Sequence, residues 1–165
     1  MKSNKEFETL VQQALSDAKK LGASQAAAEV SESQGLSLSV RKGDVETVEQ
    51  TNDRSLGVTV YHGKRRGSAS TSVLSSQAIA DTVKAAWDIA KYTAEDDFAG
   101  LPEPEDLATE FPDLKLYKPW PIETAQAIEL ALQAEAAAVG YNKAISNSEG
   151  ASVDSNTGRF VLANS

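Results

Sequence analysis

The sequence predicts an α+β fold, in which an antiparallel β-meander covered by helices is followed by a proline-rich linker and the start of a second α+β unit. Apolar residues recur at three- and four-residue steps near the start, and they alternate with polar residues over much of residues 26–73. All five prolines lie between residues 102 and 121. We therefore expect an N-terminal α+β domain at 1–93, an acidic linker at 94–121 and an incomplete second unit at 122–165.

The first predicted element is an amphipathic helix that stops at Gly22, a natural C′ residue. Ser3 and Glu6 have the spacing of a capping box. Its apolar positions are Phe7, Leu10, Val11, Ala14, Leu15, Ala18 and Leu21. This stripe indicates one buried helix face.

A meander of four or five strands is predicted next. Leu36, Leu38 and Val40 alternate with polar residues, which is typical of a strand with one wet face. Turns are expected at 42–44, at 52–53 and at 62–65. Because each connection is short, neighbouring strands should be antiparallel.

Two further helices are expected, one after Ser75 or Ser76 and one over about 122–139 between Pro121 and Gly140. The first two helices should cover one face of the sheet. Residues 144–153 and 159–163 suggest a terminal hairpin. One helix and one hairpin make a thin core, so we expect the second unit to be completed by further chain or by a partner.

Composition argues against several functions. Residues 1–93 hold 12 Lys/Arg and 11 Asp/Glu, whereas residues 94–165 hold 4 and 13, so no basic stripe favours direct nucleic-acid binding. No apolar run is long enough to span a membrane. With no cysteine and one histidine, His62, the sequence predicts no catalytic residue and no metal ligand in this chain. The lack of cysteine and the polar start suit the cytoplasm.

The end of one predicted hairpin is the remaining candidate contact site for a peptide or partner. It comprises Tyr61, His62, Lys64, Arg65 and Arg66. The basic triplet could touch a phosphate or an acidic partner. The simpler interpretation is a solvated hairpin end whose charges discourage edge aggregation, with His62 an exposed residue at its tip.

The ordered similarity of several segments adds a family resemblance. Leu56–Thr71 resembles the N-terminal region of the TldD/PmbA metallopeptidase family, also called the modulator of DNA gyrase family. The flanking segments 28–30, 35–46, 77–80, 90–93, 112–114 and 147–150 also resemble that family in order. The similarity covers nearly the whole chain but includes no catalytic signature.

The resemblance implies a part of the family's PmbA-type subunit, which lacks the metal motif and pairs with a TldD-type subunit that holds zinc. Members of the family are longer than this chain, are cytoplasmic and trim unfolded peptides as oligomers. It leaves open whether this chain is itself an enzyme, and we expect it to be inactive alone. The alternatives are a free-standing peptide-binding module and, less favoured, a regulator of DNA gyrase.

Overall fold

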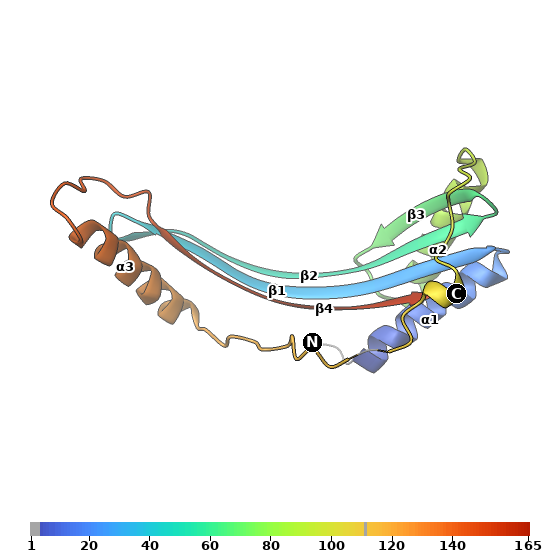
Figure 1. Ribbon diagram of the computed structural model, residues 1–165, viewed down its shortest axis with the longest axis horizontal. Helices are drawn as coiled ribbons and strands as arrows, with labels where there is room; N and C mark the ends of the chain where they lie inside the picture. Colours follow the sequence, from blue (N-terminus) through green and yellow to red (C-terminus); the bar gives the residue numbers. More distant parts are fainter. Residues whose placement is uncertain (1–3, 111) are drawn as a thin grey trace. The chain divides into compact units, whose positions relative to one another are not determined.

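The computed structural model describes residues 4–110 and 112–165 (Figure 1). The predicted cap at Ser3 lies outside the described residues. Three α-helices and a four-stranded antiparallel sheet confirm the predicted α+β class. In chain order the elements are α1 (Asn4–Lys20), β1 (Gln25–Arg41), β2 (Asp44–His62), β3 (Arg65–Thr71), α2 (Ser76–Tyr92), the 3-10 turn η1 (Pro104–Asp106), α3 (Thr124–Gly140) and β4 (Ala151–Asn164).

The sheet has the strand order β3-β2-β1-β4. β1 and β2 are joined by a two-residue turn in which Lys42 and Gly43 have φ values of 55° and 81°. Positive φ at both central positions is typical of a type I′ turn, whose twist matches that of the flanking strands. β2 then returns as β3, with Leu56 opposite Thr71 and His62 opposite Arg65.

Contacts divide the chain into two compact units that are interleaved along the sequence. Unit 1 comprises Met1–Glu32, Asp53–Pro112 and Arg159–Ser165, and unit 2 comprises Ser33–Asn52 and Asp113–Gly158. The division cuts β1, β2 and β4, so each unit contains part of these three strands. The predicted domains are consecutive segments instead, and their boundaries stay a prediction.

Unit 1 is built on one face of its part of the sheet. α1 and α2 share a core with β1 and β2, which includes Phe7, Val30, Val60 and Val83. α2 approaches β3 closely because Gly67 has no side chain: a Cβ atom there would clash with the backbone of Ala86 and Ala90. The two helices therefore cover one face of the sheet, as predicted from sequence.

The ends of the unit 1 helices also follow the sequence. After α1, the amide of Ala23 donates to the carbonyl of Ala18 at 3.1 Å and that of Gly22 to Lys19 at 3.0 Å. With Gly22 at φ 94°, this is a Schellman motif. The Ser75 hydroxyl caps α2 by accepting from the amide of Ala78 at 3.3 Å.

Unit 2 is smaller and centres on α3. Ala127 and Ala131 are buried and pack with Leu38 and Val40 of β1 and Val153 of β4. Alanine at the contact positions lets the helix approach the strands closely. The amide of Glu123 donates to the side chain of Gln126 at 3.1 Å, which caps the first turn.

The predicted turn at Asn52–Asp53 is wrong, because β2 runs without interruption from Asp44 to His62. Residues 44–55 of β2 are all exposed. Polar residues with turn propensity therefore lie in a strand that neighbouring strands hold by backbone hydrogen bonds. Pairing outweighs local turn preference here.

The predicted hairpin at the end of the chain is also wrong. Residues 144–150 form no strand, and residues 154–158 continue β4 instead of turning. Asp154 accepts a hydrogen bond from the Ser37 hydroxyl at 2.6 Å, and Arg159 pairs with Glu32 at 3.0 Å. β4 therefore pairs along β1, and the Asp-Ser-Asn-Thr-Gly run lies within a long strand because β1 offers a partner for it.

Candidate functional site

The five residues predicted as a contact site lie at the β2–β3 hairpin end of unit 1. Tyr61 is buried, whereas His62, Lys64 and Arg66 are exposed. The ring of His62 meets that of Trp87 edge-on, with centroids 5.0 Å apart. The hairpin end therefore brings the five residues together, although Tyr61 is not available at the surface.

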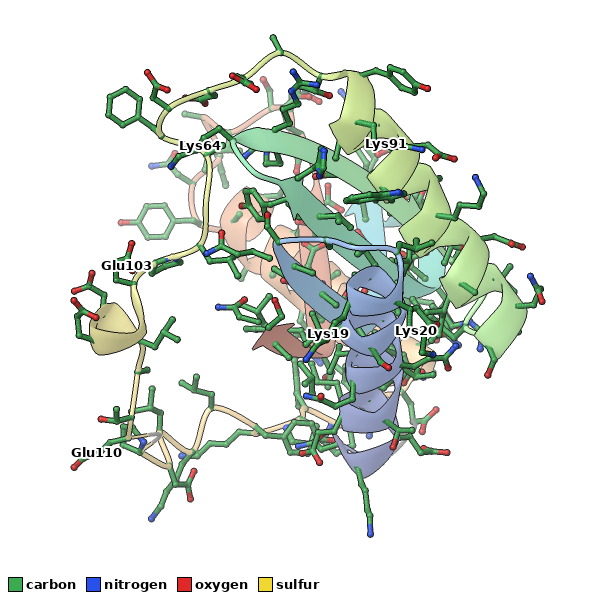
Figure 2. All side chains as sticks on the ribbon, turned by 90° about the vertical axis from the view of Figure 1, so that its right-hand side faces the viewer. Lys19, Lys20, Lys64, Lys91, Glu103 and Glu110 are labelled. Atoms are coloured by element: carbon green, nitrogen blue, oxygen red, sulfur yellow. The ribbon has the colours of Figure 1, made fainter. Side chains whose placement is uncertain are left out.

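Two of the three basic residues contact the last turn of α2 and the chain that follows it. The guanidinium of Arg65 donates to the carbonyl of Lys91 at 3.1 Å and pairs with Glu95 at 3.3 Å. Lys64 donates to the carbonyl of Ala99 at 3.4 Å, and Figure 2 shows it beside this segment. This geometry favours the structural interpretation for Lys64 and Arg65, while the role of the five residues in partner contact stays a prediction.

The sheet face opposite α1 and α2 offers a larger candidate surface within unit 1. A groove of about 530 Å³ lies along it. Its lining residues include Ala27, Glu29, Gly57, Thr59, Ser68, Ser70 and Leu162. Hydroxyl pairs link neighbouring strands here: Thr59 and Ser68 of the lining lie 2.9 Å apart, and Ser55 of the lining lies 3.0 Å from Ser31.

Small side chains give this groove its character. A Cβ atom at Gly57 would meet no other atom within 4 Å, so the floor is open at that point. Glu29 is an exposed carboxylate among the lining residues. Small side chains leave room for the backbone of another polypeptide to approach the floor. Binding there would also order few long side chains, so it would cost little side-chain entropy.

The strand β4 borders the same surface and forms an edge of the sheet. On this strand Phe160 is 67% exposed and Leu162 is 57% exposed. β4 contains no lysine and no proline, the residues that commonly protect strand edges from pairing. The part of β4 that belongs to unit 1, residues 159–164, has exposed apolar side chains and is suited to pairing with another chain.

The sequence-based reasoning did not select this surface. One feature of the sequence could have indicated the groove: neither face of the predicted strand Arg65–Thr71 carries a bulky apolar side chain. Nothing in the sequence indicated that β4 contributes Leu162 to the groove, because residues 154–158 suggest a turn within this strand.

The described residues do not supply a donor set for a metal ion. Across 4–110 and 112–165, no three His, Asp or Glu side chains converge as metal ligands would. A catalytic zinc site usually needs three protein ligands, so the residues present do not fit such a centre. Nor is any helix in this part of the chain long and apolar enough to cross a membrane.

Comparison with known proteins gives matches to one family in the N-terminal and the C-terminal half of the sequence. Residues 26–90 match the family model described as PmbA/TldA metallopeptidase domain 1, and residues 117–165 match the PmbA/TldA metallopeptidase central domain. The chain is 51% identical over 136 residues to the metalloprotease PmbA of Escherichia coli, covering 82% of this chain and 30% of that protein. It is 49% identical over 148 residues to the metalloprotease PmbA homolog of Haemophilus influenzae, covering 90% and 33%.

Solved structures agree with these matches. A putative modulator of DNA gyrase from Bacteroides thetaiotaomicron aligns with a TM-score of 0.74 at 27% identity, over 96% of this chain and 36% of that one. TldE from Thermococcus kodakarensis aligns with a TM-score of 0.74 over 94% and 35%, and at 16% identity it supports the fold alone. The chain spans about a third of the length of the relatives that it matches.

Proposed function

Because the chain belongs to the PmbA/TldD metallopeptidase family and is a portion of a PmbA-like metalloprotease, we propose that it acts as a non-catalytic N-terminal part of that subunit. In this role it assembles with a TldD-like subunit and helps to enclose unfolded peptides during proteolysis. The proposal places it in an oligomer in the cytoplasm.

The observation that carries this proposal is the sheet face of unit 1 that α1 and α2 leave open in the described residues, together with the β4 edge, which has no lysine and no proline. The groove of about 530 Å³ and the exposed Phe160 and Leu162 offer a place for another polypeptide. Binding through strand edges uses main-chain hydrogen bonds, which suits recognition of chains that differ in sequence. A subunit that handles unfolded peptides benefits from such tolerance.

Catalysis is assigned to the partner in this proposal. The described residues provide no converging set of three metal ligands. In this proposal a TldD-like subunit holds the zinc ion that activates water, and this chain contributes binding and enclosure.

A role as a DNA gyrase regulator is less well supported. The structural relative from Bacteroides thetaiotaomicron is described as a putative modulator of DNA gyrase. The net charge of −8 and the excess of carboxylates in residues 94–165 disfavour binding to DNA itself.

Two measurements test the proposal together. The purified chain should cleave no unfolded peptide, with or without added zinc, and it should co-elute with a TldD-like subunit of the same organism in size-exclusion chromatography. Phe160→Lys should weaken this association, whereas Val73→Lys, at an exposed valine outside the groove and β4, should not. Chelator-sensitive cleavage by the chain alone, or co-elution unaffected by Phe160→Lys, would contradict the proposal.

A further inference from the structure

Unit 2 contains a separate pocket of about 380 Å³ between α3, the β1–β2 turn and the segment before β4. One wall is apolar and comes from Leu132, Ala136 and Val139, which lie on one side of α3 at helical spacing. The other wall is polar. It is formed by Lys42, Gly43, Ser146, Asn147 and Ser148.

Glu135 lies at the base of this pocket, with 4% of its surface exposed. One carboxylate oxygen accepts the amide of Lys42 at 2.8 Å, and the other accepts the amide of Gly43 at 2.9 Å. Hydrogen bonds from the Gly43 amide, the Ser148 hydroxyl and the Lys42 amide lower the pKa of Glu135. Its negative charge is therefore engaged by the protein's own donors.

Two polar side chains of the pocket wall differ from Glu135 in having no hydrogen-bond partner among the described residues. Within the described residues, the ammonium group of Lys42 and the side-chain amide of Asn147 make no hydrogen bond or ion pair. Lys42 and Asn147 therefore bring to the pocket lining a cation and an amide donor that no other described residue engages. Convergent polar groups in a mainly apolar pocket are the usual features of a ligand site.

We propose that this pocket binds a carboxylate attached to an apolar group, such as the C-terminal residue of a peptide. The apolar group packs on Leu132 and Val139, and the carboxylate meets the Lys42 ammonium and the Asn147 amide. A cationic ligand would lie beside Lys42 and would find the Glu135 oxygens already hydrogen-bonded. This binding would occur whether or not the chain pairs with another subunit or takes part in proteolysis, so the proposal is independent of the proposed function.

NMR titration of the full 165-residue chain tests the site with three probes. These are acetyl-Ala-Ala-Leu with a free carboxylate, the same peptide as a C-terminal amide, and acetyl-leucine. The free peptide should give saturable shift changes at Lys42, Val139 and Asn147, and the amide should bind at least tenfold more weakly. Tighter binding of the peptide than of acetyl-leucine would assign the site to peptide ends, and equal binding to small apolar acids.

Matched variants locate the binding. Lys42→Gln should weaken it at least tenfold, whereas Lys143→Gln, at an exposed lysine outside the pocket, should leave it unchanged. Ala136→Trp fills the pocket and should abolish binding, and Ala137→Trp, at an exposed neighbour that does not line it, is the control. Equal affinity for the peptide and its amide, absence of saturable shifts, or unchanged binding to Lys42→Gln would overturn the proposal.

Discussion

At the scale of single residues, two positions join elements that are distant in sequence. Glu135 on α3 accepts backbone amides of the β1–β2 turn in unit 2. Gly67 on β3 lets α2 lie directly against the strand in unit 1. In the sequence, Glu135 is a glutamate in an alanine-rich helix and Gly67 is a glycine in a strand. Neither pattern predicts that Glu135 accepts the turn amides or that Gly67 lies against the backbone of α2.

Replacement of Glu135 by glutamine should destabilise unit 2. An amide side chain has one acceptor oxygen, so an amide of the turn would face an NH₂ group instead of an acceptor. We expect the midpoint of thermal unfolding to fall by on the order of 2–4 °C. Glu129→Gln, at an exposed position of α3, should leave it nearly unchanged.

The same carboxylate predicts a pH dependence. The pKa of Glu135 lies below its ordinary value of 4.5 in the folded chain. Its stabilisation is therefore fully present above the unfolded-state pKa and is lost as the pH falls through the lowered pKa. Thermal unfolding followed by circular dichroism should show that the parent chain and Glu135→Gln differ near pH 7 and converge in acid. A difference that grows on acidification would contradict this assignment.

A side chain at Gly67 should cost more than one at Gly57. Gly67→Ala places a methyl group against the α2 backbone, and we expect a loss of about 1–3 kcal/mol in the free energy of unfolding. Gly57→Ala meets no atom within 4 Å and should be close to neutral. Urea denaturation compares the two, and equal losses would show that the close packing of α2 on β3 is not the cause.

At the scale of elements, helices were more predictable than long strands. The stripe from Phe7 to Ala18 and the Gly22 stop specify α1 locally, because side-chain spacing and capping act within a few residues. Leu21, also predicted in the stripe, follows the helix and is exposed. The continuity of β2 and β4 depends on partners far along the chain. Asn52 and Asp154 have turn propensity, and only pairing with β1 decides against it. The hairpin end lies within one short stretch of sequence and could be predicted from it. The groove combines residues of β1, β2, β3 and β4, so it could not.

The attachment of β4 within unit 1 can be tested at Arg159. Its guanidinium pairs with Glu32 of β1 at 3.0 Å and lies over the Phe7 ring of α1 at 4.5 Å. The side chains of Arg159 and Glu32 are 19% and 13% exposed, so Arg159→Met leaves a largely buried carboxylate without its cation. We expect urea denaturation to show a loss of about 1–3 kcal/mol.

A second substitution separates the charge effect from packing. Arg159→Met combined with Glu32→Met removes both charges and should recover part of the lost stability. If the double variant is as unstable as the sum of the two single variants, the pair makes no direct contribution.

At the scale of the whole molecule, the described part of the chain has an open groove in unit 1 and a pocket in unit 2, and it lacks a converging metal donor set. The family matches extend over most of the chain, and the relatives are about three times as long. Resemblance identified the family from ordered segments. The groove and the pocket beside Glu135 required the folded chain, because each gathers residues from elements that are separated in sequence.

The most direct test of the central claim is hydrogen–deuterium exchange of the chain with and without a TldD-like subunit. If the open face of unit 1 and the edge strand bind another chain, amides of β4 and of the groove strands should exchange more slowly in the complex. Protection confined to α1 and α2, with β4 exchanging as in the free chain, would contradict the account.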